Sequence, residues 1–319
     1  MRKLLSILFL GVLFHTCDDG DVFEVELDFP DTFEHCGNLV FFKENISPAE
    51  TLSIKLDGRD IEDFLAVNAD GFYEETINFN NSTNIFNYRT YNSIPEVDIF
   101  CNDIPPANLE ITGNSFSTTG SLLIQTVLIE DDEDGIPAEL EDENLDGDND
   151  PSTNPTDTDQ DSIPNYLDAD DDGDNVLTIN ELDTENLDGD NNPLTNPKNT
   201  DANSPMNPDN IPDYLDKDDD GDGVDTRDEE NITPDDNNPA TDSTNGIIAD
   251  YLNPEVSTTV VETEYRQHII KQIYTITITV FNLQLPNLTQ EVLNFGTLVD
   301  SEGDDITVNE RVGETVFVD

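Results

Sequence analysis

The chain has 319 residues, of which 73 are acidic and 12 are lysine or arginine, so its formal net charge is −61. A charge of this sign excludes electrostatic binding to nucleic acid or to anionic lipid, because both are also negative. Hydrophobic residues make up 34% of the chain, which is low for one continuous core and sufficient for a smaller one. The composition favours solubility, disorder or cation binding.

Residues 1–16 have the layout of a secretory signal, with two bases, an apolar run and a polar exit. The run is too short to span a bilayer comfortably. It stops at Cys17, and the start resembles a bacterial lipoprotein signal, in which this cysteine would become the lipidated first residue. That pattern prefers Leu, a small residue and then Gly or Ala where Phe14, His15 and Thr16 stand. An ordinary signal peptide with a chance cysteine is the alternative. We expect an exported protein that is lipid-anchored to the cell envelope, at the outer membrane or cell surface, and that meets the membrane only through this anchor.

Residues 17–128 carry the patterns of β-strands. Alternating runs separated by turn residues predict strands at Val22–Phe29, Thr51–Leu56, Thr76–Phe79, Asn84–Tyr91 and Ser121–Leu128. No helix longer than a few turns is indicated. The expected product is an antiparallel β-sandwich.

Two cysteines remain once Cys17 is set aside. An even pair in an exported chain predicts a disulfide between Cys36 and Cys101, and the alternative is two free buried thiols. A bridge that closes a loop of about 65 residues would stabilise the domain by roughly 3–4 kcal/mol.

Residues 129–254 form an acidic segment of different composition. Between Glu130 and Asn253 there are 41 acids and three bases, and no Phe, Trp, Cys or His. Such a stretch cannot bury enough apolar surface to offset its chain entropy, so by itself it should be disordered.

The acidic segment is also a repeat. Ser162–Glu181 matches Asn210–Glu229, and Glu143–Pro155 matches Glu185–Pro197. An unconstrained acidic tail does not keep such regular spacing, so the positions of the acids carry information.

Each long repeat contains a 12-residue loop with acids at positions 1, 3, 5 and 12. Calcium prefers six to eight oxygen ligands, and a loop of this length supplies them from positions 1, 3, 5, 7, 9 and 12. Position 6 requires a turn with positive φ, which suits Gly223 and Asn175. The predicted ligands are Asp218, Asp220, Asp222, the Val224 carbonyl, Thr226 (through water) and Glu229 in one loop, and Asp170, Asp172, Asp174, Val176, Thr178 and Glu181 in the other.

Further loops of the same spacing flank these two. One offers Asp157, Asp159, Asp161, the Ile163 carbonyl and Asp168, and another offers Glu130, Asp132, Asp134, Ile136 and Glu141. Half-sites are predicted at Asp146, Asp148 and Asp150 and, in the copy, at Asp188 and Asp190. The loop before Tyr214 has Pro205 and Asn207 in place of two acids, so it is predicted not to bind.

Cation binding also follows from electrostatics. Two carboxylates about 4 Å apart in a partly shielded setting repel by up to ~4 kcal/mol. A divalent cation converts this repulsion into bonds, so its binding free energy becomes folding free energy. Magnesium is disfavoured because it demands tight octahedral geometry and keeps its waters.

Tandem acidic loops bracketed by I-P-x-Y-L-D and D-D-D-G-D-G, without flanking helices, resemble thrombospondin type 3 repeats, and above all the versions in surface lipoproteins of Bacteroidota such as flavobacteria. The resemblance covers about residues 130–253. It implies that the chain wraps around several calcium ions with almost no hydrophobic core. The cysteines of the animal repeats are missing. Tyr166, Leu167, Tyr214 and Leu215 are expected to be packing wedges between loops.

Residues 255–319 return to a strand-rich composition, with runs at Thr258–Tyr265, Ile269–Leu285 and Glu291–Val299. They either complete the first domain, which the acidic segment would then interrupt, or form a small domain of their own.

No nucleophile–base arrangement or nucleotide-binding motif is present, so we expect a protein that is not an enzyme. Two functions remain. The first is a calcium-binding surface lipoprotein with a structural or adhesive role. The second is a ligand-binding module for surface glycan or protein, in which calcium only orders the fold. An exposed aromatic row among Phe72, Tyr73, Phe86, Tyr88 and Tyr91 would favour the second.

Overall fold

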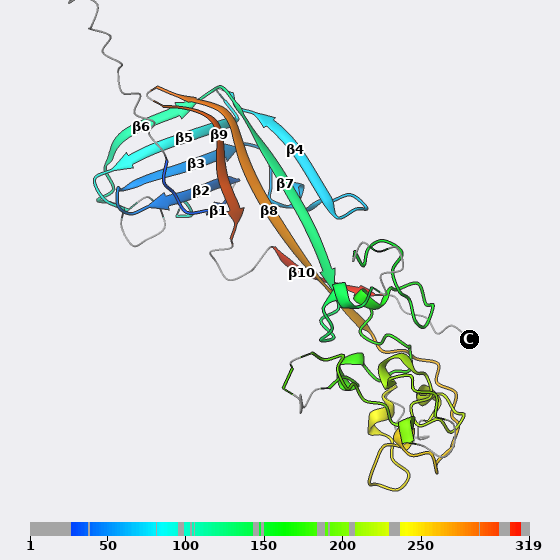
Figure 1. The fold of residues 1–319 in the computed structure, drawn as a ribbon. Helices are drawn as coiled ribbons and strands as arrows, with labels where there is room; N and C mark the ends of the chain where they lie inside the picture. The colour runs from blue at the N-terminus through cyan, green and yellow to red at the C-terminus, as the bar shows by residue number, and fades with distance from the viewer. Residues whose placement is uncertain are drawn as a thin grey trace, which may run out of the picture. The chain divides into compact units, whose positions relative to one another are not determined.

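The computed structural model describes a mainly β protein with a coil-rich acidic middle (Figure 1). The described residues are 27–313 except 38, 81, 95–98, 103, 105, 143–146, 148–149, 184–188, 191, 204–207, 230–236, 287 and 300–306. Cys17 and the signal-like start therefore lie outside them. Among the described residues, no helix has the length and apolar character needed to cross a membrane.

The strands that precede the acidic segment are β1 to β7. Their bounds are β1 Thr32–Cys36, β2 Val40–Asn45, β3 Glu50–Leu56, β4 Phe72–Asn78, β5 Asn84–Tyr91, β6 Ile111–Ser117 and β7 Ser121–Asp131, with one short helix, α2, at Glu62–Leu65. The strands after it are β8 His268–Leu285, β9 Leu288–Leu298 and β10 Val308–Gly313. All ten belong to one sheet with the order β4-β7-β8-β9-β1-β2-β3-β5-β6, and β10 pairs with β8.

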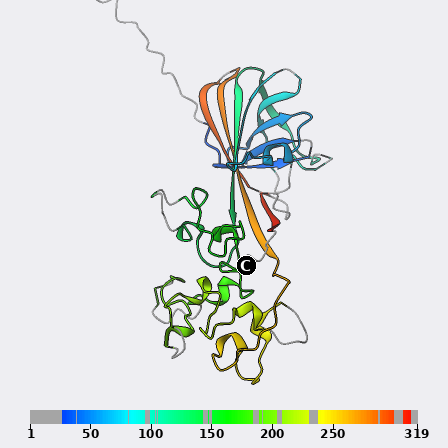
Figure 2. The same cartoon turned by 90° about the vertical axis from the view of Figure 1, so that its right-hand side faces the viewer.

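The acidic segment contains only 3-10 turns, η1 to η8, joined by coil in its described parts (Figure 2). They are η1 Ala138–Leu140, η2 Asn165–Leu167, η3 Thr178–Asn180, η4 Asp201–Asn203, η5 Asp213–Leu215, η6 Thr226–Asp228, η7 Pro239–Thr241 and η8 Asp250–Leu252. The predicted mainly β fold, interrupted by a coil-rich acidic segment, is confirmed.

The chain divides into two compact units. The first unit comprises residues 1–57, 78–122 and 279–296, and the second comprises residues 58–77, 123–278 and 297–319. The acidic segment belongs to the second unit, together with parts of the long strands β7 and β8.

The first unit is built around a cluster of phenylalanines. The ring of Phe33 on β1 lies 5.3 Å from those of Phe41 on β2 and Phe295 on β9, and Phe295 lies 6.3 Å from Phe86 on β5. All four side chains are buried, each contributing roughly 2–3 kcal/mol through removal from water. Since β5 and β9 are not neighbours in the sheet, their contact means that the sheet curls over its own core. The two layers of the predicted sandwich are thus parts of one sheet.

A buried lysine is tied to this core. Lys43 on β2 donates hydrogen bonds to the carbonyls of Pro30 and Phe295, at 3.0 and 2.9 Å, and its ammonium lies 5.0 Å from the Phe295 ring centre. Burial lowers the pKa of Lys43 to about 8, although the charge of Asp31 opposes this effect.

The predicted disulfide between Cys36 and Cys101 is confirmed. It joins the end of β1 to the connection between β5 and β6, and it suits an exported protein.

One predicted strand is not observed, and another lies mostly outside the described residues. Thr258–Tyr265 is coil in which only Val260 forms an isolated parallel bridge, with Glu229 of the acidic segment. For Val22–Phe29, residues 22–26 lie outside the described part and residues 27–29 are coil. At Val260 local alternation is overridden because the backbone makes another bond: its N–H donates to the Asp228 carbonyl at 2.8 Å.

The five aromatic candidates for a binding row do not form one. Phe86 and Tyr91 are buried, and the Tyr88 hydroxyl donates to Glu50 at 2.6 Å. Phe72 and Tyr73 lie on β4 and are half-buried, and the Tyr73 ring packs edge-on against Phe64 at 5.9 Å. These side chains serve packing, so they lend no support to a ligand-binding module.

Candidate metal centres

Loops 170–181 and 218–229 share one hydrogen-bonding pattern. In the first, the carboxylate of Asp170 accepts the N–H groups of Asp174 (3.2 Å) and Asn175 (2.9 Å), and Asp172 accepts the N–H of Asp174 (3.2 Å). Each of these N–H groups binds an acid that lies earlier in the same loop. The chain is thereby wrapped around its own carboxylates.

The second loop repeats these bonds. Asp218 accepts the N–H groups of Asp222 (3.2 Å) and Gly223 (2.9 Å), and Asp220 accepts the N–H of Asp222 (3.1 Å). Because both copies of the long repeat adopt the same bonds, the geometry follows from the motif and not from local accident.

Positive φ recurs in every loop at positions 4 and 6. At position 6 the residues are Gly223 (95°), Asn175 (73°), Ser162 (85°) and Gly135 (107°), as the sequence predicts. At position 4 they are Gly221 (71°), Gly173 (72°), Gln160 (68°) and Glu133 (59°), a position for which the motif specifies no residue type. Asn175 has a further role, because its side chain donates to the Glu264 carbonyl at 3.2 Å and accepts the Arg266 N–H at 3.1 Å.

Position 7 of each loop is fixed by its N–H group. The N–H donates to the acid at position 5 in all four loops: Ile136 to Asp134 (2.7 Å), Ile163 to Asp161 (2.6 Å), Val176 to Asp174 (2.6 Å) and Val224 to Asp222 (3.0 Å). The ligand role of the carbonyls at this position stays a prediction.

Several buried carboxylate oxygens have no hydrogen-bond donor. Both oxygens of Glu141, Asp171, Glu181, Asp219 and Glu229 are buried in this way, as is one oxygen of Asp132, Asp134, Asp172, Asp174 and Asp220. A buried anion without a partner costs several kcal/mol, so chains do not gather such groups without compensation. These oxygens are the free ligands that a hard cation requires.

The spacing of the acids suits one ion per group. Ligand oxygens of Asp170, Asp172 and Asp174 all lie within 4.8 Å of one another, and the same holds for Asp157, Asp159 and Asp161. Oxygens on opposite sides of a calcium ion, at about 2.4 Å from it, are separated by about this distance. The donor set is composed entirely of oxygen, which also fits calcium.

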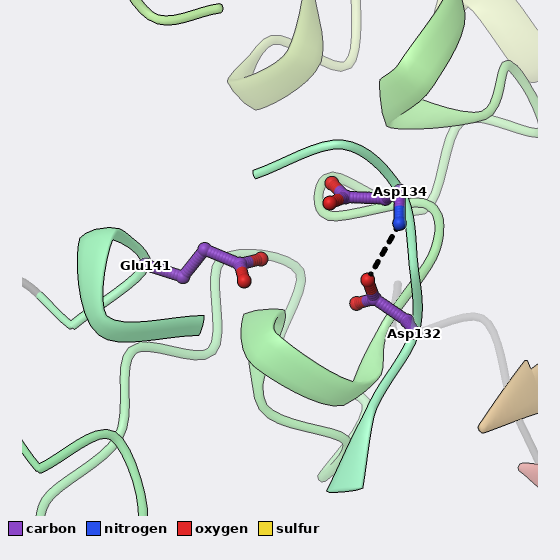
Figure 3. A group of neighbouring side chains, drawn as sticks. All are labelled: Asp132, Asp134 and Glu141. Atoms are coloured by element: carbon purple, nitrogen blue, oxygen red, sulfur yellow. Dashed lines mark hydrogen bonds between the residues drawn. The ribbon is translucent and has the colours of Figure 1, made fainter. Parts of the chain in front are cut away.

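Figure 3 shows the group of Asp132, Asp134 and Glu141, which we call the Glu141 cluster. The Asp134 N–H donates to Asp132 at 3.0 Å, and Glu141 reaches toward both aspartates from the end of turn η1. Burial, then the charge of Asp134, raises the pKa of Asp132 to about 9. Burial, then Asp132, raises the pKa of Glu141 to about 10. Without a cation, burial and mutual repulsion therefore disfavour the charged forms of Asp132 and Glu141.

Glu130 does not join the Glu141 cluster, although it was predicted as its first ligand. Its carboxylate pairs with Arg311 on β10 at 2.7 Å and accepts a hydrogen bond from Gln272 on β8 at 2.8 Å. Burial raises its pKa, but these bonds outweigh burial and the net shift is downward. The sequence spacing could not reveal this, because Arg311 lies 181 residues away.

In the loop 157–168, the acid at position 12, Asp168, lies beside a histidine. Asp168 lies with Oδ1 2.6 Å from Nδ1 of His268, the first residue of β8, and both side chains are buried. Burial lowers the pKa of His268, but the hydrogen bond and charge of Asp168 outweigh it and raise the pKa. Asp157 accepts the N–H groups of Gln160 (2.8 Å) and Ser162 (3.3 Å), and the second of these bonds, from position 6, also occurs in the loops 170–181 and 218–229.

The hydroxyls of the predicted ligands Thr178 and Thr226 accept backbone hydrogen bonds. The Thr178 hydroxyl accepts the N–H of Asp171 at 3.1 Å, and the Thr226 hydroxyl accepts the N–H of Asp219 at 3.2 Å. Both threonines are fully buried. They fix the backbone of the acid at position 2 of their loop.

The loop before Tyr214, predicted not to bind, holds an acidic group. Oxygens of Asp201, Asp209 and Asp216 lie within 4.8 Å of one another. The Asp209 N–H donates to Asp201 at 2.9 Å, as the Asp161 N–H donates to Asp159 at 3.0 Å. Asp201 therefore takes the place of Asp159, with a longer stretch of chain between the two acids. This insertion breaks the register of the repeat, which concealed the group in the sequence.

The two I-P-x-Y-L-D stretches and the related I-A-D-Y-L-N at residues 248–253 each form a short turn that binds a threonine. The residue before the tyrosine is Asn165, Asp213 or Asp250, and each accepts the N–H of Thr158 (2.9 Å), Thr200 (2.6 Å) or Thr244 (2.7 Å), respectively. This recurring clamp holds the beginning of a loop against its end.

The predicted half-sites are only partly described. Asp146, Asp148 and Asp188 lie outside the described residues. Asp150 and Asp190 are exposed, and they accept the N–H groups of Ser152 (3.0 Å) and Asn192 (2.8 Å).

Comparison with known proteins gives one match. A family model described as BamM C-terminal matches residues 131–207, about a quarter of the chain. No curated protein and no solved structure matches the chain. The match contains the Glu141 cluster and the loops 157–168 and 170–181. The chain thus has a BamM C-terminal-like region rich in buried acidic clusters, and the resemblance to thrombospondin type 3 repeats stays a prediction.

Proposed function

We propose that this chain is an exported, calcium-binding protein whose acidic segment folds around several Ca²⁺ ions. The observation that carries the proposal is the set of buried carboxylate oxygens without donors, arranged in loops of one repeated geometry. The expected ligands are acids at positions 1, 3, 5 and 12. A bound ion would supply the positive charge that these groups lack.

The charge balance of the acidic segment supports this proposal. Its three bases, Lys198, Lys217 and Arg227, cannot neutralise 41 acids. Structural order in such a segment requires counter-charge from outside the chain.

We further propose a structural or adhesive role at the cell surface, with the chain tethered by a lipid on Cys17. The disulfide and the signal-like start support export, and the repeated loops suit a stiff, ion-dependent spacer. The proposal assigns no catalytic activity to the chain.

The test is a calcium titration of residues 18–319 after removal of metal with a chelator. Calorimetry should detect several bound ions, and small-angle scattering should show compaction as they bind. The same titration with magnesium is the control, and it should give weaker binding. Absence of heat and of compaction at millimolar calcium would overturn the proposal.

A further inference from the structure

The second position of the two long-repeat loops holds an acid with no role in the 12-residue motif. These acids are Asp171 and Asp219, which are only 2% and 1% exposed. Neither carboxylate has a hydrogen-bond donor on either oxygen. The motif predicts a position of this kind to be indifferent and solvent-facing, so the burial requires an explanation.

Both acids are held in place by their own loops. The N–H of each is bound by a fully buried threonine later in the loop, Thr178 for Asp171 and Thr226 for Asp219. The threonine N–H is itself bound to the carbonyl just before the loop, of Ala169 (3.0 Å) or Lys217 (2.7 Å). The backbone of the second position is thus anchored twice, which leaves its side chain free to serve a different site.

Asp219 reaches the site of the preceding long-repeat loop. Its carboxylate oxygen lies within 4.8 Å of oxygens of Asp174 and Glu181, at positions 5 and 12 of the loop 170–181. We call these three residues the Glu181 cluster. All three are buried, and both oxygens of Glu181 lack a donor.

Asp171 occupies the same position in its own loop, and it shares with Asp219 the burial and the lack of a donor on either oxygen. The arrangement of the second position therefore recurs along the chain.

We propose that Asp219 is a bridging ligand that completes the cation site of the preceding long-repeat loop, at the Glu181 cluster. The inference rests on the proposed calcium function and adds to it a rule of assembly. An ion in the loop 170–181 then also holds the loop 218–229 in place. The bridge closes a chain segment of about 40 residues, and the bound ion compensates the lost chain entropy.

The test counts bound ions in single and double variants of residues 18–319, by equilibrium dialysis at a calcium concentration that just saturates the wild type. Asp219→Asn is nearly isosteric, and its loss of a charged ligand should weaken one site at least about tenfold. Asp219→Asn and Glu181→Gln should each remove one ion, and the double variant should also remove only one. Asp219→Asn with Glu229→Gln should remove two ions.

The matched control is Asp218→Asn, one residue earlier and at position 1 of its own loop. It should show the opposite pattern, with one ion lost in combination with Glu229→Gln and two lost in combination with Glu181→Gln.

The outcomes separate the inference from the proposed function. Unchanged binding by Asp219→Asn would mean that a shared proton, and not a cation, joins Asp219 to Glu181, which would overturn the inference. Two ions lost in the Asp219→Asn, Glu181→Gln variant would overturn it as well. If the Asp219 variants fail to become compact in calcium, Glu181→Gln decides: it should lose amide-exchange protection around Asp219 as well as around Glu181, and a loss around Glu181 alone would overturn the inference. A wild type that binds no calcium would instead reject the proposed function.

Discussion

The first unit and the acidic segment are held together by different kinds of interaction. In the first unit, Phe33, Phe41, Phe86 and Phe295 exclude water and a disulfide closes the chain. In the acidic segment, most of the buried side chains are acids, such as Asp172, Asp174 and Asp219. An apolar core is complete once the chain has folded, whereas a core of carboxylates needs a component from solution. The two regions should therefore respond to different perturbations.

Removal of calcium should produce the largest difference between the regions. A chelator should abolish amide-exchange protection in residues 165–181, because the unbalanced carboxylates repel one another. Protection in β2, β3 and β5 should be unchanged, since their core is apolar. Hydrogen exchange with mass spectrometry measures both regions in one sample. Equal loss of protection in β3 would contradict the comparison.

Reduction of the disulfide should destabilise the first unit and leave the acidic segment unaffected. Without the bond between Cys36 and Cys101, the first unit should lose roughly 3–4 kcal/mol of unfolding free energy, because the unfolded chain regains the entropy of a loop of about 65 residues. The number of calcium ions bound should not change. Denaturant unfolding and a calcium titration of the Cys36→Ser, Cys101→Ser variant check the two halves of this expectation.

The calcium-free acidic segment should become more ordered as the pH falls. Glu141, Glu229 and Asp132 have pKa values raised to about 10, 9 and 9, chiefly by burial. An acid whose folded pKa exceeds its unfolded value takes up a proton on folding, so this contribution is fully present below the unfolded pKa of about 4 to 4.5. It is lost as the pH rises through the folded value.

Two measurements test this pH dependence. Small-angle scattering in chelator should show compaction between about pH 7 and pH 4.5. Calcium binding near pH 7 should release protons, which calorimetry in buffers of different ionisation enthalpy can count. A calcium-free segment that is equally expanded at both pH values would refute this expectation.

The smallest effect should come from Lys43. Its contribution to the unfolding free energy should rise with pH, whereas the contribution of the buried acids falls. Its pKa is lowered to about 8 in the folded state, against 10.5 when unfolded. The burial cost of its charge is present below pH 8 and disappears as the pH rises from about 8 to 10.5, so the first unit should gain about 1–3 kcal/mol over that range. In Lys43→Met this gain should be absent. Denaturant unfolding at pH 7.5 and pH 10, at constant calcium, compares the two proteins.

Strand prediction depended on apolar residues that alternate with polar ones along the sequence. Thr51–Leu56 shows this alternation through Leu52, Ile54 and Leu56, so it was predicted, although residues on both of its faces are buried. β2 was missed because its apolar residues are consecutive: Phe41 and Phe42 are both buried, Phe41 against Phe33 and Phe42 stacked on Phe100 at 4.4 Å. A strand that is covered on both faces does not need alternation in its sequence.

The sequence by itself determined the loops of the acidic segment. The acids at positions 1, 3 and 5 and the turn residue at position 6 act through bonds within a single loop, so their spacing is sufficient to predict their geometry. It likewise determined the cysteine pair, since only two cysteines follow Cys17.

Only the tertiary structure decided which acids face a neighbouring loop and which face a base. Glu130 forms an ion pair with Arg311, and Asp168 lies beside His268. Asp219 lies close to Glu181 of the loop 170–181. Each of these pairings depends on distances between segments remote in sequence, and a local pattern carries no information about such distances. For that reason Asp171 and Asp219, which look redundant in the sequence, prove to be among the most deeply buried acids of the protein.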